Sequence, residues 1–199
     1  MTSLREGEVD ADPVRQFNVW LGEAREAGLP LPEAMTLATA DASGRPSARM
    51  LLLKGADESG FTFFTGYDSR KGRELEVNPR AAIVVYWHPL GRQVRVEGPV
   101  RKLPAEESDA YFATRPPRSR AAAAASRQSA VIPSREELEA EFERLLAEHG
   151  GEVPRPERWG GYVLEPEVIE LWQHRDDRLH DRLRFTREGE GWRFERLAP

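Results

Sequence analysis

The segment AAIVVYWHPLGRQVRVEGPV, residues 81–100, decides the predicted fold. An apolar run over 81–87 and an alternating run over 93–103 flank the four residues 88–91, a pattern typical of two paired antiparallel strands. Gly98-Pro99, inside the second run, predicts a bulge or a sheet edge, because glycine and proline weaken the interior of a strand. These residues are therefore expected to form a long hairpin.

Strand and helix signals on both sides extend this hairpin into a mostly β chain. Further strands are expected at 35–40, 48–54, 61–65, 162–164, 168–172, 183–186 and 192–197. Helices are expected between the cap residue Asp12 and Gly28, at 69–77, 105–114 and 119–125, and after the cap residue Ser134. Because the helices occur in blocks, the fold class is mostly β (α+β), a β-barrel with flanking helices, and not a doubly wound parallel sheet.

Length and composition exclude several classes of protein. The 199 residues suit one domain with a sizeable core, and the absence of cysteine excludes disulfides and cysteine chemistry. Residues 1–12 are polar and acidic, which predicts a disordered tail before a single domain over 13–199. No secretory leader and no run of roughly 20 apolar residues is present, so a cytoplasmic protein without a membrane partner is expected.

Charge is unevenly distributed along the chain. The 34 acidic residues outnumber the 29 basic ones, and the net charge of −5 argues against a nucleic-acid partner. Residues 114–134, in contrast, hold four arginines and no acid. Because a guanidinium matches the oxygens of a phosphate, this local excess of positive charge predicts a small anionic ligand.

The motif RMLLLK, residues 49–54, places a cation at each end of an apolar strand. On a strand, Arg49, Leu51 and Leu53 share one face, whereas Lys54 lies on the other. Each cation could meet an anion, although two solvated strand ends explain the same pattern equally well.

The motif FFTGYDSRK, residues 63–71, is a more specific signal for a phosphate. A strand runs into a turn, and Ser69 then caps a helix whose first turn holds Arg70 and Lys71. Two cations are unfavourable at this end of the helix dipole, so a negative partner is expected to compensate them. The motif lacks the glycine-rich loops that bind nucleoside triphosphates or dinucleotides.

A second anion site is predicted by the helical middle of the chain. Tyr111 and Arg115 are four residues apart and share a helix face. Arg118, Ser119 and the pair Gln128-Ser129 follow in the stretch that lacks acids. Either Tyr111 or Arg115 alone is more often structural, but together with the local charge they favour a site.

The segment WQHRDDRLHDR, residues 172–182, carries the last candidate site residues. In an extended segment Arg178, His180 and Arg182 share one face. A histidine between two cations is expected to stay neutral and to act as a hydrogen-bonding group or a base. Trp172 could wall a flat heterocycle, although a core position is its default. Metal binding is not expected, because the four histidines lack ligand spacing.

Taken in order, these segments resemble the pyridoxine/pyridoxamine 5′-phosphate oxidase family. The resemblance covers residues 35–199 and also rests on RQVRVEGPV, YFATRPPRS, SRQS, WGGYVLEPEVIELWQ, RLHDR and the final ERLAP. It implies a six-stranded antiparallel split β-barrel and a homodimer that binds FMN at the subunit interface. The cofactor-binding residues implied are Arg49, Met50, Leu51, Leu52, Leu53, Lys54, Phe64, Thr65, Ser69, Arg70, Lys71, Gln93, Gln128, Ser129, Trp172 and Arg182.

The resemblance also implies the reaction. Pyridoxine 5′-phosphate and pyridoxamine 5′-phosphate would be oxidised to pyridoxal 5′-phosphate, with O2 as the acceptor, giving H2O2 and, from the amine, ammonia. The implied substrate-binding residues are Lys54, Tyr111, Arg115, Ser119, Arg178 and His180, of which Arg178 and His180 are the catalytic pair over the pyridine ring.

The chain departs from the family pattern at three places. Gly66 stands where asparagine is usual, residues 120–127 are nearly all alanine, and residues 174–177 are unusually charged. None of these positions is an implied flavin contact. Two alternatives share the sequence signals: a reductase on the same barrel that uses FMN or a deazaflavin, and a non-catalytic protein that binds FMN or pyridoxal phosphate.

Overall fold

The computed structural model describes residues 3–199, and within them ten strands pair antiparallel throughout. The strands are β1 Ala34–Ala40, β2 Pro46–Leu52, β3 Gly55–Asp57, β4 Gly60–Gly66, β5 Arg80–Trp87, β6 Arg92–Lys102, β7 Trp159–Leu164, β8 Val168–Gln173, β9 Asp181–Glu188 and β10 Gly191–Arg196. The helices are η1 Glu6–Glu8, α1 Pro13–Glu26, α2 Arg70–Val77, η2 His88–Leu90, α3 Ala105–Thr114, α4 Pro117–Ala125 and α5 Arg135–Glu148.

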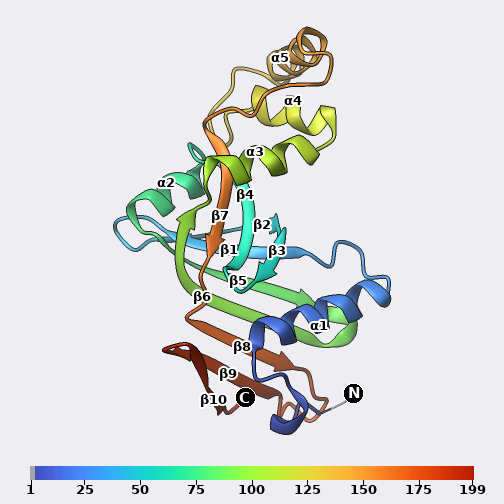
Figure 1. The fold of residues 1–199 in the computed structure, drawn as a ribbon, viewed down its shortest axis with the longest axis vertical. Coiled ribbons are helices and arrows are strands. Elements are labelled where there is room, and N and C mark those ends of the chain that lie inside the picture. Colours follow the sequence, from blue (N-terminus) through green and yellow to red (C-terminus); the bar gives the residue numbers. More distant parts are fainter. Residues whose placement is uncertain (1–2) are drawn as a thin grey trace.

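The predicted fold class is confirmed, because the sheet curls into a split barrel with helices at its flanks (Figure 1). The main strand order is β10-β9-β8-β6-β5-β1-β2, while β4 joins through β7 to β6 and β3 pairs with β4. The sheet of the described residues has ten strands, whereas the resemblance implies six; the hairpin of β9 and β10 and the three-residue strand β3 provide three of the four additional strands.

Strand β6 pairs with three other strands, β5, β7 and β8, and so joins the two parts of the sheet. Along one edge, residues 92–99 pair with β5, as the predicted hairpin requires. Along the other edge, residues 92–97 pair with β8 and residues 100–102 pair with β7. Because the partner of β6 on this edge changes from β8 to β7, the sheet turns a corner between residues 97 and 100.

Gly98 lies at this corner. Its pairing with Ala81 of β5 is uninterrupted, so the predicted bulge is absent there. A Cβ built on Gly98 would lie 1.9 Å from the carbonyl oxygen of Glu165, in the turn between β7 and β8. The backbone of that turn bonds to both neighbours of Gly98, since Glu165 N–H donates to Pro99 and Glu167 N–H donates to Glu97. Only glycine leaves room for this approach.

Replacing Gly98 by alanine is therefore expected to lower the free energy of unfolding by about 1–3 kcal/mol or more, because backbone atoms must move to admit the methyl group. The measurement is the urea midpoint at a fixed protein concentration. Gly22→Ala is the matched control: a Cβ there meets no atom within 4 Å, and the site is inside helix α1. That change should instead stabilise by about 0.5–1 kcal/mol. Equal urea midpoints for the two variants would contradict the inference that the corner requires glycine at position 98.

Helix α1 closes one side of the core as its sequence predicts. Asp12 accepts a hydrogen bond from the N–H of Val14 at 2.9 Å, and Gly28 adopts φ +69° just after the helix ends. The apolar face of α1 buries Phe17 and Trp20, and the Phe17 ring packs 5.0 Å from that of Phe61 on β4. The core is therefore formed between α1 and the inner face of the sheet.

Helices α3, α4 and α5 gather at the end of the molecule opposite β9 and β10, and α2 lies at the side of the barrel (Figure 1). Ser69 caps α2 by accepting from the N–H of Gly72, and Ser134 caps α5 by accepting from the N–H of Glu137. Helix α3 packs on β7, whose residues are buried on both faces. None of the helices within residues 3–199 is long and apolar enough to cross a membrane.

The first residues differ from the expected disordered tail. Residues 1 and 2 lie outside the described residues, but Leu4 is only 8% exposed and packs in the core. Its N–H donates to Asp181 at 3.1 Å, and its carbonyl accepts from Arg196 at 2.9 Å. Local composition could not reveal this packing, because the partners lie at the opposite end of the sequence.

Candidate functional site

A cavity of about 550 Å³ opens where the end of β4 meets α3 and α4. Nine of the site residues predicted from sequence line it: Leu51, Leu52, Lys54, Phe64, Thr65, Tyr111, Arg115, Ser119 and Gln128. Residues from the RMLLLK motif, the FFTGYDSRK motif and the helical middle therefore share one hollow, although they are up to 77 positions apart in the chain (Leu51 to Gln128).

Aromatic rings form one wall of this cavity. The ring of Phe64 on β4 stacks on that of Tyr111 on α3, with centroids 3.9 Å apart and planes inclined by 18°. Trp159, at the start of β7, is nearly parallel to both rings. Stacked rings at these separations present a flat, rigid apolar surface.

Arg115 is the cation held deepest against this wall. Its guanidinium lies 4.6 Å from the centroid of the Trp159 ring and 5.3 Å from that of Phe112. Burial lowers the pKa of Arg115, yet a guanidinium remains charged at neutral pH. Among the described residues, its buried Nη1 has no hydrogen-bond partner. A buried charged donor without a partner is costly, so this group suits an anion in the cavity.

Lys71 lies beneath the cavity as a second buried cation. Its ammonium donates to three neutral oxygens, those of Thr65 at 3.0 Å, Gln128 at 3.1 Å and Ser69 at 3.2 Å. Burial, the larger cause, and the nearby charge of Arg49 together lower the pKa of Lys71 to about 8, although the charge of Glu74 opposes the shift. Among the described residues no ion pair includes Lys71. Its charge is therefore poorly compensated within the chain.

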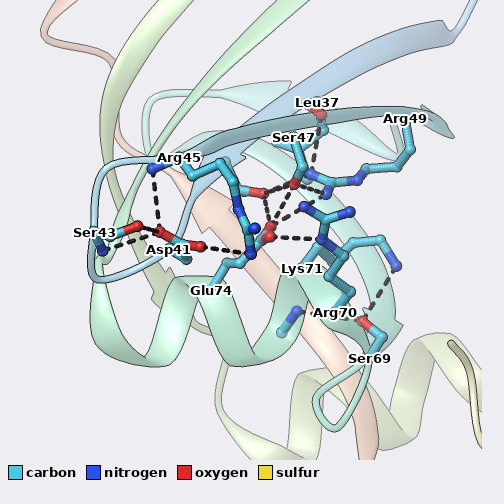
Figure 2. A network of polar contacts seen from close by, with 12 residues as sticks. Leu37, Asp41, Ser43, Arg45, Ser47, Arg49, Ser69, Arg70, Lys71 and Glu74 are labelled. Atoms are coloured by element: carbon cyan, nitrogen blue, oxygen red, sulfur yellow. Dashed lines mark hydrogen bonds and ion pairs between the residues drawn. The ribbon is translucent and has the colours of Figure 1, made fainter. Parts of the chain in front are cut away.

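Two more cations meet one carboxylate beside Lys71 (Figure 2). Arg49 on β2 donates from Nη2 to Glu74 Oε2 at 3.2 Å, and Arg70 on α2 donates from Nε to Glu74 Oε1 at 2.9 Å. Burial raises the pKa of Glu74, but hydrogen bonds from Ser47, Thr39, Arg70 and Arg49 outweigh it and hold that pKa at about 2. The β2 and α2 motifs thus meet through an ionised carboxylate.

Three predicted cofactor residues belong neither to the cavity lining nor to the group of cations around Lys71. Leu53 is buried in the core, and Met50 is 62% exposed on the outward face of β2. Ser129 follows Gln128 in the exposed loop after α4 and adopts φ +70°.

The remaining predicted residues form a separate cluster on the far side of the barrel. Gln93 on β6 pairs with Trp172 on β8, which pairs with Arg182 on β9, so the three side chains lie in one row on one face. The Trp172 ring lies 4.7 Å from that of His180. Arg182 binds both carboxylate oxygens of Glu170, at 2.8 and 3.0 Å. None of these residues lines the cavity.

The expected extended segment at Arg178 is wrong. Arg178 adopts φ +65° in a turn closed by its N–H donating to the carbonyl of Arg175, so it does not alternate with His180 and Arg182. Asp177 causes the difference, because its side chain accepts from the N–H of Leu179 and favours a turn. His180 Nδ1 accepts from the N–H of Arg175 at 3.1 Å, which requires an unprotonated Nδ1.

Sequence reasoning missed several residues of the cavity. Arg158 and Trp159 line it beside Asp68 and Gly66. Trp159 begins an apolar run in which a tryptophan is by default a core residue, and its neighbour Arg158 has no periodic signal. Arg158 Nε is buried without a hydrogen-bond partner among the described residues, and its charge is paired with Asp68, whose Oδ2 lies 3.9 Å away. Within residues 3–199, no cluster of three His, Asp or Glu side chains is suited to a metal ion.

An antiparallel barrel curled about one core, with a cation-lined and aromatic-walled cavity at one end, defines a split-barrel protein with a candidate anion-binding site. Residues 21–148 match the family described as Pyridoxamine 5′-phosphate oxidase, and residues 159–199 match the Pyridoxine 5′-phosphate oxidase C-terminal dimerisation region. The chain belongs to the pyridoxamine 5′-phosphate oxidase family.

Individual relatives agree with this assignment. The Pyridoxine/pyridoxamine 5′-phosphate oxidase of Burkholderia mallei (strain SAVP1) is 58% identical over 99% of this chain and 94% of its own length. The protein of the same name from Paraburkholderia phytofirmans is 55% identical over 99% of this chain and 93% of its own length.

Two solved structures are similar. PhzG from Burkholderia lata 383, in complex with tetrahydrophenazine-1-carboxylic acid, superposes with a TM-score of 0.95 at 36% identity and covers 100% of this chain and 99% of its own. A pyridoxamine 5′-phosphate oxidase-related, FMN-binding protein from Nostoc punctiforme shares the fold, with a TM-score of 0.79 at 18% identity over 96% of this chain and 100% of its own.

Proposed function

We propose that this chain is an FMN-dependent oxidase that converts pyridoxine 5′-phosphate and pyridoxamine 5′-phosphate to pyridoxal 5′-phosphate, with O2 as the acceptor. The observation that carries the proposal is the cavity in which a buried, unpartnered Arg115 guanidinium lies on an aromatic wall, close to the uncompensated Lys71. Flat rings and phosphates need these two kinds of surface. The relatives at 58% and 55% identity carry the name of this activity.

The residues present fit FMN. Lys71, Arg49 and Arg70 would hold its phosphate at the start of α2, where backbone N–H groups also favour an anion. The buried ammonium of Lys71, bonded only to neutral oxygens, is the specific observation in favour of this fit. When bound, FMN would supply the acceptor for a hydride equivalent (two electrons and one proton) from the substrate carbon, and O2 would take up the two electrons with two protons, the second from the substrate hydroxyl or amino group, to give H2O2.

The substrate phosphate would bind at the other cations of the cavity. Arg115 offers its free Nη1, and Tyr111 and Ser119 add hydroxyl groups on the same lining. Lys54, exposed at the end of the RMLLLK motif, would add a further charge. These groups bind and orient the substrate, while the aromatic wall excludes water from one side of the ring.

A second copy of the chain would complete the site. Gln93, Trp172 and Arg182 form one row, and Figure 1 draws β8 and β9 at the opposite end of the molecule from α3 and α4. We infer that this row and the turn holding Arg178 and His180 reach the cavity of a partner subunit. The match of residues 159–199 to a dimerisation region supports this arrangement.

Exposed apolar side chains give the same proposal an independent support. Met50 on β2 and Tyr86 on β5 are 62% and 51% exposed and line one hollow of the surface. Large apolar side chains gathered on one face are typical of an interface between proteins. A homodimer would cover them.

The deciding experiment adds pyridoxamine 5′-phosphate to the FMN-loaded protein in air and measures H2O2, pyridoxal 5′-phosphate and ammonia. We expect the three products in equal amounts. Flavin bleaching without air but no H2O2 in air would indicate a reductase, and no bleaching would indicate a carrier. The similarity to PhzG provides a further arm, since a reduced phenazine carboxylate could place its carboxylate at Arg115. Faster oxidation of that compound would overturn the proposed substrate.

A further inference from the structure

Glu74 is a buried acid among the cations assigned to the FMN phosphate. Its side chain is only 6% exposed, although it lies on α2 one turn after Arg70. A glutamate at this place in a short surface helix would ordinarily point to solvent. Here each of its two carboxylate oxygens accepts hydrogen bonds from a different set of neighbouring side chains (Figure 2).

Two strands fix one of these oxygens. Thr39 on β1 donates its hydroxyl hydrogen to Glu74 Oε2 at 2.5 Å, and Ser47 on β2 does so at 2.6 Å. The same two hydroxyl oxygens accept from Arg49, Thr39 at 2.6 Å from Nη1 and Ser47 from Nη2. Arg49 also donates to Glu74 directly at 3.2 Å, so its guanidinium is held in one orientation by a closed set of bonds.

The other oxygen holds the helix side of the cluster. Arg70 donates from Nε to Glu74 Oε1 at 2.9 Å, which leaves its two terminal nitrogens uncommitted to this carboxylate. Lys71 is different, since it donates to Thr65, Ser69 and Gln128 and not to Glu74. Glu74 therefore accepts hydrogen bonds from two of the three cations, whereas it influences Lys71 only through its charge.

From this geometry we infer that Glu74 is a positioning residue for the phosphate of FMN: its carboxylate joins β2 to α2 by holding the guanidinium groups of Arg49 and Arg70. The inference rests on the proposed FMN site. The residue does not touch the cofactor. It reduces the repulsion between two guanidinium groups and fixes their directions before the phosphate arrives, so less conformational freedom is lost on binding.

Two physical effects of Glu74 oppose each other, and this makes the inference testable. A negative charge near a phosphate dianion weakens binding by repulsion, whereas the fixed orientation of the guanidinium groups strengthens it. If positioning dominates, removing Glu74 weakens FMN binding. If repulsion dominates, removal tightens it. The inference states that positioning dominates.

The experiment titrates the apoprotein with FMN and, separately, with riboflavin, which has the same ring system and no phosphate, by following flavin fluorescence. For Glu74→Ala we expect the Kd of FMN to rise tenfold or more, while that of riboflavin stays within twofold of wild type. Glu76→Ala is the matched control, because Glu76 is on the same helix, is 67% exposed and, among residues 3–199, forms an ion pair with Lys102 alone. The Kd of FMN and the Kd of riboflavin for Glu76→Ala should both equal those of the wild type.

Glu74→Gln tests the same role without shortening the side chain. Its amide keeps one acceptor oxygen and can hold only one of the two guanidinium groups, so the Kd of FMN should lie between those of wild type and Glu74→Ala. An unchanged or lower Kd of FMN in Glu74→Ala, equal losses for FMN and riboflavin, or a glutamine variant as weak as the alanine variant would overturn the inference. A wild-type protein that binds no FMN would overturn the proposed function itself, and the inference with it.

Discussion

A mixture of two weakly active variants, Arg115→Ala and Arg178→Ala, is expected to recover about a quarter of the wild-type oxidase activity once their subunits exchange. Each variant alone should lose roughly 10- to 150-fold in kcat/KM, since each loses a charge-assisted contact to the substrate. Arg115 belongs to the cavity, and Arg178 belongs to the turn at the other end of the chain. If one subunit supplies the cavity and its partner the turn, each mixed dimer contains one site with both wild-type residues.

The matched control mixes Arg115→Ala with Lys54→Ala. Both residues line the same cavity, so every site in such a mixed dimer carries one of the two changes and activity should not recover. Arg178→Ala should keep its FMN, as judged by the visible flavin spectrum after gel filtration. Recovery in both mixtures, or in neither, would contradict a site shared between subunits.

Replacing Lys71 by methionine is expected to have effects of opposite sign on stability and on cofactor binding. Because burial lowers the pKa of Lys71 to about 8, the folded apoprotein holds this charge at a cost. Methionine removes that cost and should raise the free energy of unfolding of the apoprotein at pH 7 by on the order of 1–3 kcal/mol. The same change removes a cation from the FMN phosphate, so the Kd of FMN should rise roughly 10- to 150-fold.

The pH dependence of the stability of the apoprotein provides a second measurement for this prediction. Below pH 8 Lys71 is protonated in both the folded and the unfolded chain, and the full cost of burial is present. Between pH 8 and 10.5 the unfolded chain binds more protons, so this residue makes the folded apoprotein more stable as the pH rises. The urea midpoint of Lys71→Met should lack this rise, whereas Lys102→Met, at an exposed lysine paired with Glu76, should keep it. A destabilised Lys71→Met apoprotein would show that the ammonium is well compensated.

Local signals in the sequence predicted most elements of the fold. Alternation and turn residues located nine of the ten strands, and Asp12, Ser69 and Ser134 cap helices as expected. Strand β3 has three residues, too few for any alternation to be visible. The packing of Leu4 could not be predicted either, because it depends on residues near position 181.

The sequence predicted many individual residues of the candidate site but not the shape of the cavity that they line. Charge and spacing identified Lys54 and Arg115 but not Arg158 among the cations of the cavity, and its aromatic wall needs β4, α3 and β7 to be in place. Glu74 resembles any solvated helix glutamate until β1 and β2 surround it with hydroxyl groups. The alternation of the following strand predicted the wrong orientation for Arg178, because the side chain of Asp177 stabilises a turn there.

The corner in β6 bears on how the chain can be divided. The two regions of family similarity meet between residues 148 and 159, which invites the view that each is a separable module. Yet β7 and β8, in the second region, provide all the partners along one edge of β6. A fragment ending near residue 150 would leave that edge with unsatisfied amides and carbonyls, the kind of surface on which polypeptides stack into aggregates. We therefore expect the sheet to fold as one cooperative unit, which a fragment without β7 and β8 could not complete.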